Sequence, residues 1–257
     1  MGGLPYENYI FDLYGTLVDI RTREDKPAAW AALAHFYGYY GAAYTPAELR
    51  AAFARLTAEA EATPGTPDPR RQNYEAWPEI ELETVFRQLF RQKGAAAGRE
   101  LAVHAGQFFR AMTTERLRLY DGVPDLLQTL RQKGGRVYLL SNAQQIFTAY
   151  ELRALGLTPY FDAVYLSSAC GCKKPDPRFF ACPLTGQHLD PARSIMVGND
   201  GRCDIDGARR AGLATLYVRS NLSPQEPWPR ADLTLRAMDI PAMARLLTGV
   251  PGEAKGV

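Results

Sequence analysis

The chain begins with a short apolar stretch that ends on an aspartate, and this feature constrains the fold more than any other. Residues 8–12 read Asn-Tyr-Ile-Phe-Asp, and Gly15 and Thr16 then interrupt the apolar pattern. An apolar run that ends in this way predicts a buried strand with Asp12 at its carboxyl end. In open α/β sheets, ligands bind outside the carboxyl ends of the strands. Because burying an unpaired charge is unfavourable, Asp12 is expected either to be paired or to take part in chemistry.

The sequence from about residue 25 to residue 116 has a helical pattern. Apolar residues recur there at every third or fourth position in Ala-rich stretches. This spacing predicts four helices, at residues 26–39, 46–61, 79–93 and 100–119. Thr45 precedes a proline and is the predicted N-cap of the second helix.

Beyond residue 122 the sequence alternates between apolar strands and amphipathic helices. Strands are predicted at residues 136–142, 163–167, 194–198 and 214–218. Alternation of this kind predicts a parallel sheet with helices on both of its faces. The predicted fold class is therefore α/β, a Rossmann-like parallel-sheet core with an inserted all-helical cap domain. Residues 1–20 and 117–257 are assigned to the core, and residues 21–116 to the cap.

Composition and charge argue against several classes of function. The net charge of the 257 residues is +2, which gives no indication of a nucleic-acid partner. No apolar run approaches the roughly 20 residues that span a bilayer, so no membrane partner is expected. The N-terminus lacks a secretory signal, and the four cysteines lack the spacing of a zinc site, so we expect a cytoplasmic protein with free thiols. The expected partner is a small-molecule substrate, and the expected state is a monomer or homodimer.

Short polar motifs lie just past four of the predicted strands or in the loops after them. They are Asp12 with Gly15 and Thr16, Ser141-Asn142, Lys173-Lys174-Pro175, and Asn199-Asp200 with Asp204. In a doubly wound sheet these loops converge on one cleft. A nucleophilic carboxylate, a hydroxyl and an amide, a lysine, and further carboxylates that hold a hard cation together describe phosphoryl transfer through an aspartyl-phosphate.

In their order and spacing, these motifs resemble those of the haloacid dehalogenase superfamily of hydrolases, in the branch with a helical cap between the first two motifs. The resemblance spans nearly the whole chain and includes the runs at 174–177 and 204–212. It implies that Asp12 is the nucleophile. It also implies that the transferring group is surrounded by Thr16, Ser141, Asn142 and Lys174. Lys174 is preferred to Lys173 because the family lysine directly precedes the proline.

The resemblance also implies an Mg²⁺ cofactor. Its expected ligands are Asp12, the backbone carbonyl of Tyr14, Asp200 and Asp204, with Asn199 nearby. The family often has Gly-Asp where residues 198–200 of this chain read Gly-Asn-Asp. The metal carboxylate is therefore expected to be displaced by one residue.

Tyr14 is the main departure from the family pattern. Family phosphatases usually carry a second aspartate here as general acid and base, and a tyrosine, with a pKa of about 10, is a poor substitute near neutral pH. Tyr14 is nevertheless kept among the catalytic candidates. The run Asp-x-Tyr-Gly-Thr-Leu with a downstream aspartate, here Asp19, is instead typical of 2-haloacid dehalogenases, which need no metal. The acids Asp200 and Asp204 favour the phosphatase, because they would repel a substrate carboxylate unless a cation screened them.

The sequence therefore predicts an Mg²⁺-dependent phosphatase that acts on a small phosphorylated metabolite. Two alternatives remain open, a metal-independent 2-haloacid dehalogenase and a non-catalytic binding or regulatory protein on the same fold. The candidates for substrate binding are Gly15, Arg21 and Arg23, because the loop and hinge after the first motif would close over a substrate. Arg70 and Arg71 are further candidates for holding a substrate anion.

Overall fold

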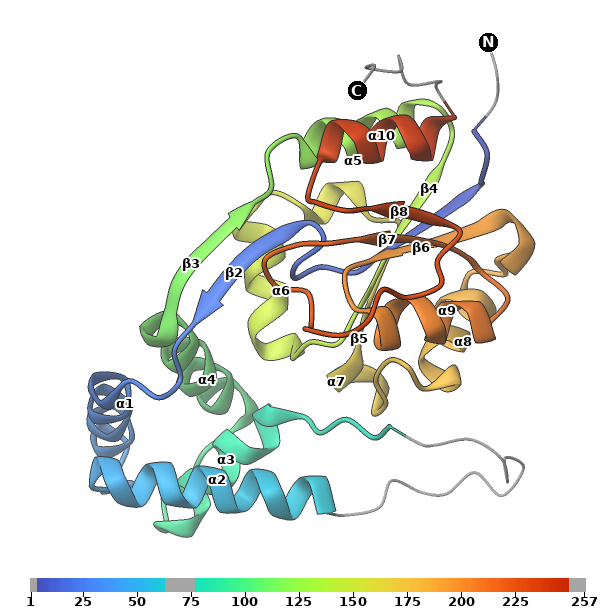
Figure 1. The fold of residues 1–257 in the computed structure, drawn as a ribbon. Coiled ribbons are helices and arrows are strands. Elements are labelled where there is room, and N and C mark those ends of the chain that lie inside the picture. Colours follow the sequence, from blue (N-terminus) through green and yellow to red (C-terminus); the bar gives the residue numbers. More distant parts are fainter. Residues whose placement is uncertain (1–3, 63–76, 250–257) are drawn as a thin grey trace, which may run out of the picture.

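Six of the described strands form a parallel sheet with the strand before Asp12 near its centre. The computed structural model describes residues 4–62 and 77–249. The strands pair in the order β5-β4-β1-β6-β7-β8, and every neighbouring pair is parallel (Figure 1). Their bounds are Asn8–Phe11 (β1), Arg136–Ser141 (β4), Ala163–Leu166 (β5), Ser194–Gly198 (β6), Ala214–Val218 (β7) and Leu233–Leu235 (β8). Phe11 lies level with Leu139 of β4 and with Val197 of β6, so these three strands end close together.

Side chains that alternate along the strands divide the core between the two faces of the sheet. Tyr9 and Phe11 pack into one buried cluster with α5 (Val123–Gln132), α6 (Gln145–Ala154) and α10 (Ile240–Thr248). Ile10 packs instead with α8 (Pro177–Gly186) and α9 (Gly207–Arg210). Because the central strands are buried on both faces, their sequences are continuous apolar runs. The predicted α/β class, with a parallel sheet between two helical layers, is confirmed.

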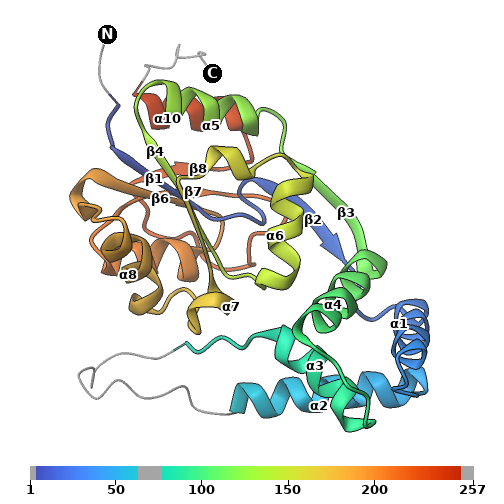
Figure 2. The same cartoon turned by 180° about the vertical axis from the view of Figure 1, so that it is seen from behind.

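The four described helices between β2 (Val18–Thr22) and β3 (Thr114–Leu119) form a separate layer at one end of the sheet, here called the helical unit (Figures 1 and 2). They are α1 (Pro27–Tyr39), α2 (Pro46–Ala62), α3 (Leu82–Gln92) and α4 (Arg99–Thr113). Thr45 caps α2 as predicted, since its hydroxyl accepts the Glu48 N–H (3.2 Å) and the Glu48 carboxylate accepts the Thr45 N–H (2.8 Å). Phe86 and Phe109 lie in the buried cluster of this unit, which Phe147 of α6 joins.

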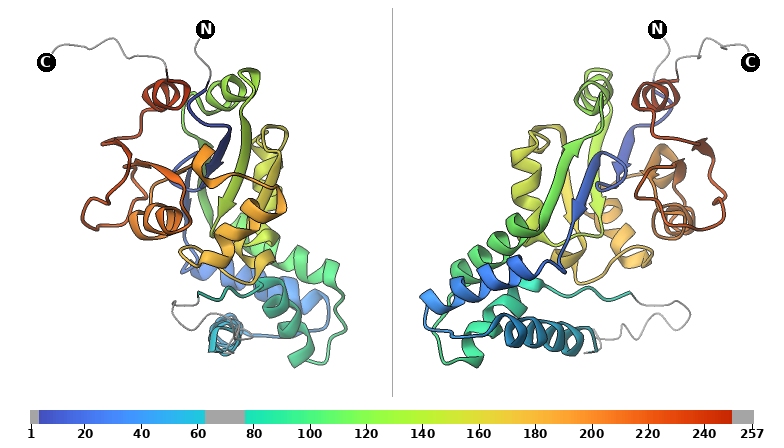
Figure 3. Two further views of the ribbon diagram at one scale, coloured as in Figure 1. Left: turned by 90° about the vertical axis from the view of Figure 1, so that its right-hand side faces the viewer. Right: turned by 60° about the vertical axis from the view of Figure 1, so that its left-hand side comes forward.

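The predicted helix at residues 100–119 is wrong in its last six residues. α4 ends at Thr113, and β3 follows it and pairs antiparallel with β2 (Figure 3, right). The stretch Thr-Glu-Arg-Leu-Arg-Leu ends in alternating charged and apolar residues, and β2 supplies a pairing partner from far away in the sequence. The domain boundaries predicted after residues 20 and 116 fall inside this two-stranded ribbon. β2, β8 and α10 are not among the predicted elements.

Asp19 anchors the ribbon to the core. Its carboxylate is 2% exposed and accepts hydrogen bonds from Arg116 (3.0 Å) and Arg118 (3.1 Å) of β3. Asn221, in the loop after β7, donates to its other oxygen (3.0 Å). Although burial opposes ionisation, Asn221 and the two arginines hold the pKa of Asp19 below its usual range. Asp19 therefore has a structural role in joining the ribbon to the sheet.

The helical unit contacts the core at a second place, through residues 77–82, which lead into α3. This segment lies against the loop between α7 (Ser167–Cys170) and α8. The Lys173 N–H donates to the Trp77 carbonyl (2.9 Å), and the Trp77 N–H donates to the Asp176 carboxylate (3.0 Å). The segment therefore helps to hold the backbone of the loop that carries Lys174.

Two further features complete the description of the fold. No helix among the described residues is long and apolar enough to cross a membrane. The four cysteines, all of which lie in the described part of the chain, form no disulfide.

We predict that Asp19→Asn lowers the free energy of unfolding by about 1 kcal/mol near neutral pH, a value reduced because the exposed arginines are screened by solvent. Since the pKa of Asp19 is lowered by folding, the wild-type advantage should be complete above the unfolded pKa of about 4 and should disappear as the pH falls through the folded value. Urea denaturation between about pH 7 and pH 3 measures this change, with the exposed Asp125→Asn as the matched control. A difference that stayed constant down to the lowest pH would contradict the prediction.

Candidate active site

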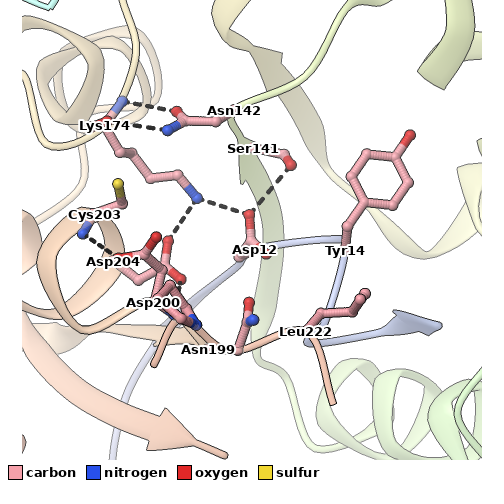
Figure 4. A pocket seen from close by; sticks show the side chains of 11 residues that line it. Asp12, Tyr14, Ser141, Asn142, Lys174, Asn199, Asp200, Cys203, Asp204 and Leu222 are labelled. Atoms are coloured by element: carbon pink, nitrogen blue, oxygen red, sulfur yellow. Dashed lines mark hydrogen bonds and ion pairs between the residues drawn. The ribbon is translucent and has the colours of Figure 1, made fainter. Parts of the chain in front are cut away.

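Asp12 follows β1 directly and lies among polar side chains from several loops (Figure 4). Its Oδ1 accepts hydrogen bonds from the Lys174 ammonium (2.8 Å) and from the Ser141 hydroxyl (3.2 Å). Its Oδ2 faces the Thr16 hydroxyl (3.4 Å). Asp12 is largely buried but borders a cavity, so its carboxylate is held in a fixed orientation next to space for a small ligand.

Lys174 is buried and bridges two carboxylates. Its ammonium donates to Asp12 (2.8 Å), to Asp204 (2.7 Å) and to the Leu140 carbonyl (2.8 Å), which uses all three of its N–H groups. Burial alone would lower the pKa of Lys174, but Asp12 and Asp204 raise it, so this lysine is charged. Lys173 does not border the cavity, and Lys174 is the lysine that the fold brings to Asp12.

Asn142 holds the backbone of Lys174. Its amide nitrogen donates to the Lys174 carbonyl (3.0 Å), and its amide oxygen accepts the Lys174 N–H (2.8 Å). This paired contact joins the end of β4 to the loop after α7. Asn142 also borders the cavity, so it both lines the site and positions the lysine.

Asp204 and Asp200 are held differently in the turn after β6. Asp204 is buried, with one oxygen on Lys174 and the other accepting the Asp200 N–H (2.9 Å). Gly198 allows this approach, because a Cβ there would lie 2.3 Å from the Asp204 carboxyl group. Burial raises the pKa of Asp204, and Lys174 opposes that shift. Asp200 borders the cavity, and its Oδ1 accepts the Cys203 N–H (2.7 Å).

The Tyr14 side chain turns away from Asp12 (Figure 4). Its hydroxyl is bonded to Thr148 (2.9 Å) and donates to the Glu151 carboxylate, both on α6. Glu151 is 2% exposed and also accepts a bond from Arg110 of α4 (2.7 Å). Burial, followed by the charge of Glu151, raises the pKa of Tyr14 well above its usual value. This orientation gives no support to the catalytic role expected for the phenol.

The site residues enclose a cavity of about 170 Å³. Its lining consists of Asp12, Tyr14, Ser141, Asn142, Lys174, Asn199, Asp200, Cys203, Asp204, Leu222 and Pro224. Thr16 lies beside it, and its hydroxyl is within hydrogen-bonding distance of the Asp12 carboxylate (3.4 Å) and of the Asn199 amide oxygen (3.2 Å). Gly15, an expected substrate contact, instead packs under Asn199. Its φ is +86°, and a Cβ there would lie 2.4 Å from the Asn199 amide nitrogen, so only glycine fits.

Arg21 and Arg23 do not border this cavity. They lie at the end of β2 and just beyond it, where Arg21 (3.1 Å) and Arg23 (3.9 Å) pair with Glu115 of β3. The substrate-binding role expected for them therefore gains no support, and they form part of the ribbon. Arg70 and Arg71 lie outside the described residues.

Four contributors to the site are absent from the sequence prediction. Leu222 and Pro224 enter the cavity wall from the loop after β7, Cys203 lines it beside Asp204, and Glu151 holds the Tyr14 hydroxyl. A signal for Glu151 exists, because an acid among apolar residues on one helical face must find a partner if it is buried. The two loop residues had no such signal, since periodicity carries no information on the path of a loop.

The oxygen donors around the cavity are of the type that binds Mg²⁺. They are the side chains of Asp12, Asn199 and Asp200, and Tyr14, whose backbone carbonyl is the further ligand expected from the sequence, is also a lining residue. Within the described residues, no three His, Cys, Asp or Glu side chains cluster closely enough to hold a metal ion by themselves. Asn199, backbone and water oxygens would therefore complete the coordination. Because both oxygens of Asp204 are already engaged, Asp200 is the better placed of the two acids.

We predict that Lys174→Met lowers the free energy of unfolding by about 3–5 kcal/mol, because two buried carboxylates would lose their shared cation. The neighbouring Lys173→Met is the matched control and should change it by less than about 0.5 kcal/mol. Urea unfolding of both variants measures the difference. Equal effects of the two substitutions would show that the bridge between Asp12 and Asp204 does not stabilise the fold.

Comparison with known proteins places these segments in a family. The family model for haloacid dehalogenase-like hydrolases matches residues 6–212. A phosphoserine phosphatase from Thermus thermophilus is 33% identical over 158 residues, which cover 62% of each chain. A glyceraldehyde 3-phosphate phosphatase from Methanothermobacter thermautotrophicus is 36% identical over 110 residues, which cover 43% of this chain and 49% of that protein. The match thus spans 49–62% of the length of these curated relatives.

Solved structures show the same fold. A 2-haloacid dehalogenase from Pseudomonas syringae pv. Tomato has a TM-score of 0.64 at 19% identity, covering 94% of this chain and 96% of that one. At this identity the likeness concerns the fold alone. The family model, by contrast, covers β1, β4, β5 and β6, the helical unit and all four motifs of the cavity, and on that match the chain belongs to the haloacid dehalogenase-like hydrolases.

Proposed function

We propose that this protein is an Mg²⁺-dependent phosphatase that hydrolyses a small phosphorylated metabolite. The observation that carries the proposal is the charge balance of the cavity. Among its described lining residues there are three carboxylates, those of Asp12, Asp200 and Asp204, and one cation, the ammonium of Lys174. An anionic substrate would be repelled by this excess of carboxylates unless a divalent cation neutralised it. The phosphatases among the curated relatives support the same proposal.

In this reaction the Asp12 carboxylate attacks phosphorus and forms an aspartyl-phosphate. Lys174 and Ser141 hold Oδ1, which fixes the carboxylate in one orientation for the attack. The Lys174 charge also stabilises the transferring group as negative charge develops on its oxygens. When bound, Mg²⁺ would supply further charge neutralisation. Water then hydrolyses the aspartyl-phosphate, which releases phosphate and restores Asp12.

A metal-independent 2-haloacid dehalogenase is the second candidate, and Tyr14 is the residue that favours it. In that reaction Asp12 would attack carbon, and the halide would leave without a proton. The substrate carboxylate, however, would need a cation. Lys174, the one lysine or arginine that borders the cavity in the described chain, is already shared by Asp12 and Asp204. The phosphatase is therefore preferred.

We expect phosphate release from a panel of phosphate esters with Mg²⁺, and its loss in the presence of a chelator. Asp12→Asn should reduce kcat by a factor of at least about 10³, because the nucleophile is lost at nearly constant size. Asp125→Asn, on the exposed side of α5, is the matched control and should retain activity. Metal-free halide release from 2-haloacids would support the second candidate instead. No phosphate release and no halide release would favour a binding or regulatory protein.

We also expect Asp200→Asn to weaken Mg²⁺ binding by about tenfold or more, a loss typical for groups that support a metal. Isothermal titration calorimetry of the protein with MgCl₂ measures this without any substrate. Asp206→Asn, in the same turn but outside the cavity lining, is the matched control. Unchanged binding in Asp200→Asn would mean that Asp200 is not a ligand.

A further inference from the structure

We infer that this protein selects phosphorylated substrates by the basicity of the oxygen that leaves phosphorus, and that it favours acyl, enol and aryl phosphates over alkyl phosphates. The inference rests on the proposed function and concerns the same cavity. It follows from where the described residues place proton donors around Asp12.

Cleavage of the bond between phosphorus and the leaving oxygen gives that oxygen the electron pair. An alkoxide is a strong base and needs a proton as it departs, whereas a carboxylate, enolate or phenolate departs as the anion. In the complete reaction, an acyl phosphate and water give a carboxylate and dihydrogen phosphate, with no proton taken from the protein. A cavity without a placed proton donor therefore accelerates the cleavage of weakly basic leaving groups selectively.

The Tyr14 phenol is not placed as such a donor. Its hydroxyl donates a hydrogen bond to the Glu151 carboxylate, and the Thr148 hydroxyl lies 2.9 Å from the Tyr14 hydroxyl oxygen. Glu151 in turn accepts a bond from Arg110 (2.7 Å), whose guanidinium lies 6.0 Å from the centre of the Tyr14 ring. Turning the phenol toward Asp12 would deprive a buried carboxylate of a donor, which is costly. Tyr14 therefore lines the cavity with its hydroxyl pointing away from Asp12 (Figure 4).

The other polar groups of the cavity are committed elsewhere among the described residues. Lys174 gives its three N–H groups to Asp12, Asp204 and the Leu140 carbonyl. The Ser141 hydroxyl donates to Asp12 as well. The amides of the two lining asparagines are not acids. The lining aspartates bind Lys174 or are the proposed ligands of the cation. Cys203 also borders the cavity, but a thiol is only a weak hydrogen-bond donor. Among the described residues, no lining hydroxyl, ammonium or carboxyl group is thus oriented to protonate a departing alkoxide.

This inference separates the chain from its named relatives. Phosphoserine and glyceraldehyde 3-phosphate, which appear in the names of two of them, are both alkyl phosphates. The feature of this chain that carries the inference is the direction of one side chain, Tyr14, which Glu151 of α6 and, through it, Arg110 of α4 hold in place.

The test is the dependence of kcat/KM on leaving-group basicity, measured with Mg²⁺. The probes are acetyl phosphate, a series of substituted phenyl phosphates and a primary alkyl phosphate such as glycerol 3-phosphate. kcat/KM reports cleavage of the first bond and excludes the later hydrolysis of the aspartyl-phosphate, which all substrates share. We expect kcat/KM to fall steadily as the basicity of the leaving oxygen rises. The alkyl phosphate should react about 10²–10⁴-fold more slowly than the aryl phosphates, which is the range a placed general acid supplies.

Variants at position 14 sharpen the test. Tyr14→Asp carries a side chain too short to reach Glu151, so its carboxyl group would lie by the cavity and could protonate the leaving oxygen. It should raise kcat/KM for the alkyl phosphate at least about tenfold and flatten the dependence. Tyr14→Phe should keep the steep dependence of the wild type. The exposed Tyr39→Phe, on the helical unit, is the matched control and should leave the dependence unchanged.

A flat dependence in the wild type would overturn the inference and leave the phosphatase function standing. Selective loss of alkyl phosphate turnover in Tyr14→Phe would do the same, because it would show the phenol acting as the acid. No turnover of any phosphate in the series would overturn the proposed function itself, and the inference with it. Where a variant fails to fold, the wild-type dependence alone decides.

Discussion

One ammonium group, buried between two carboxylates, organises the candidate active site. Lys174 contacts Asp12 at 2.8 Å and Asp204 at 2.7 Å, so three motifs that are far apart in the sequence are joined by charge. Desolvating three ions is unfavourable, and the arrangement is stable only because each charge finds a partner at close range. It also leaves a net negative charge beside the cavity, which is the physical reason to expect a cation there.

The sheet makes this cluster possible. β1 lies between β4 and β6, so the residues that follow the three strands meet at one edge. The Leu140 carbonyl, near the end of β4, accepts the third N–H of Lys174, and Gly198, at the end of β6, leaves room for Asp204. Asn142 then fixes the lysine backbone from the core, while Trp77 bonds to Lys173 from the helical unit. The position of the lysine thus depends on both the core and the helical unit.

The helical unit reaches the site by a second route, through the Tyr14 hydroxyl. Arg110 on α4 and Tyr14 in the loop after β1 share the buried carboxylate of Glu151 on α6. A displacement of α4 relative to α6 would therefore act on the ion pair and on the wall of the cavity together. Asp19 is the buried carboxylate that joins the ribbon to the site in the same way. It links β3 to the loop that contributes Leu222 and Pro224 to the cavity wall.

The sequence by itself determined the elements that local pattern encodes. The apolar runs predicted β1, β4, β6 and β7, and helical spacing with a capping threonine predicted α2, because periodicity and capping act within a few residues. The order of the motifs was enough to gather Asp12, Ser141, Lys174 and Asp204 at one edge, since parallel strands of a doubly wound sheet end together.

Long-range pairing decided the rest of the structure. The residues of β3 form a strand because β2 lies beside them, and Arg21 and Arg23 face Glu115 because the ribbon aligns them. Tyr14 points away from Asp12 because a buried carboxylate on α6, 137 residues along the chain, binds its hydroxyl, and no local pattern around Tyr14 contains that partner.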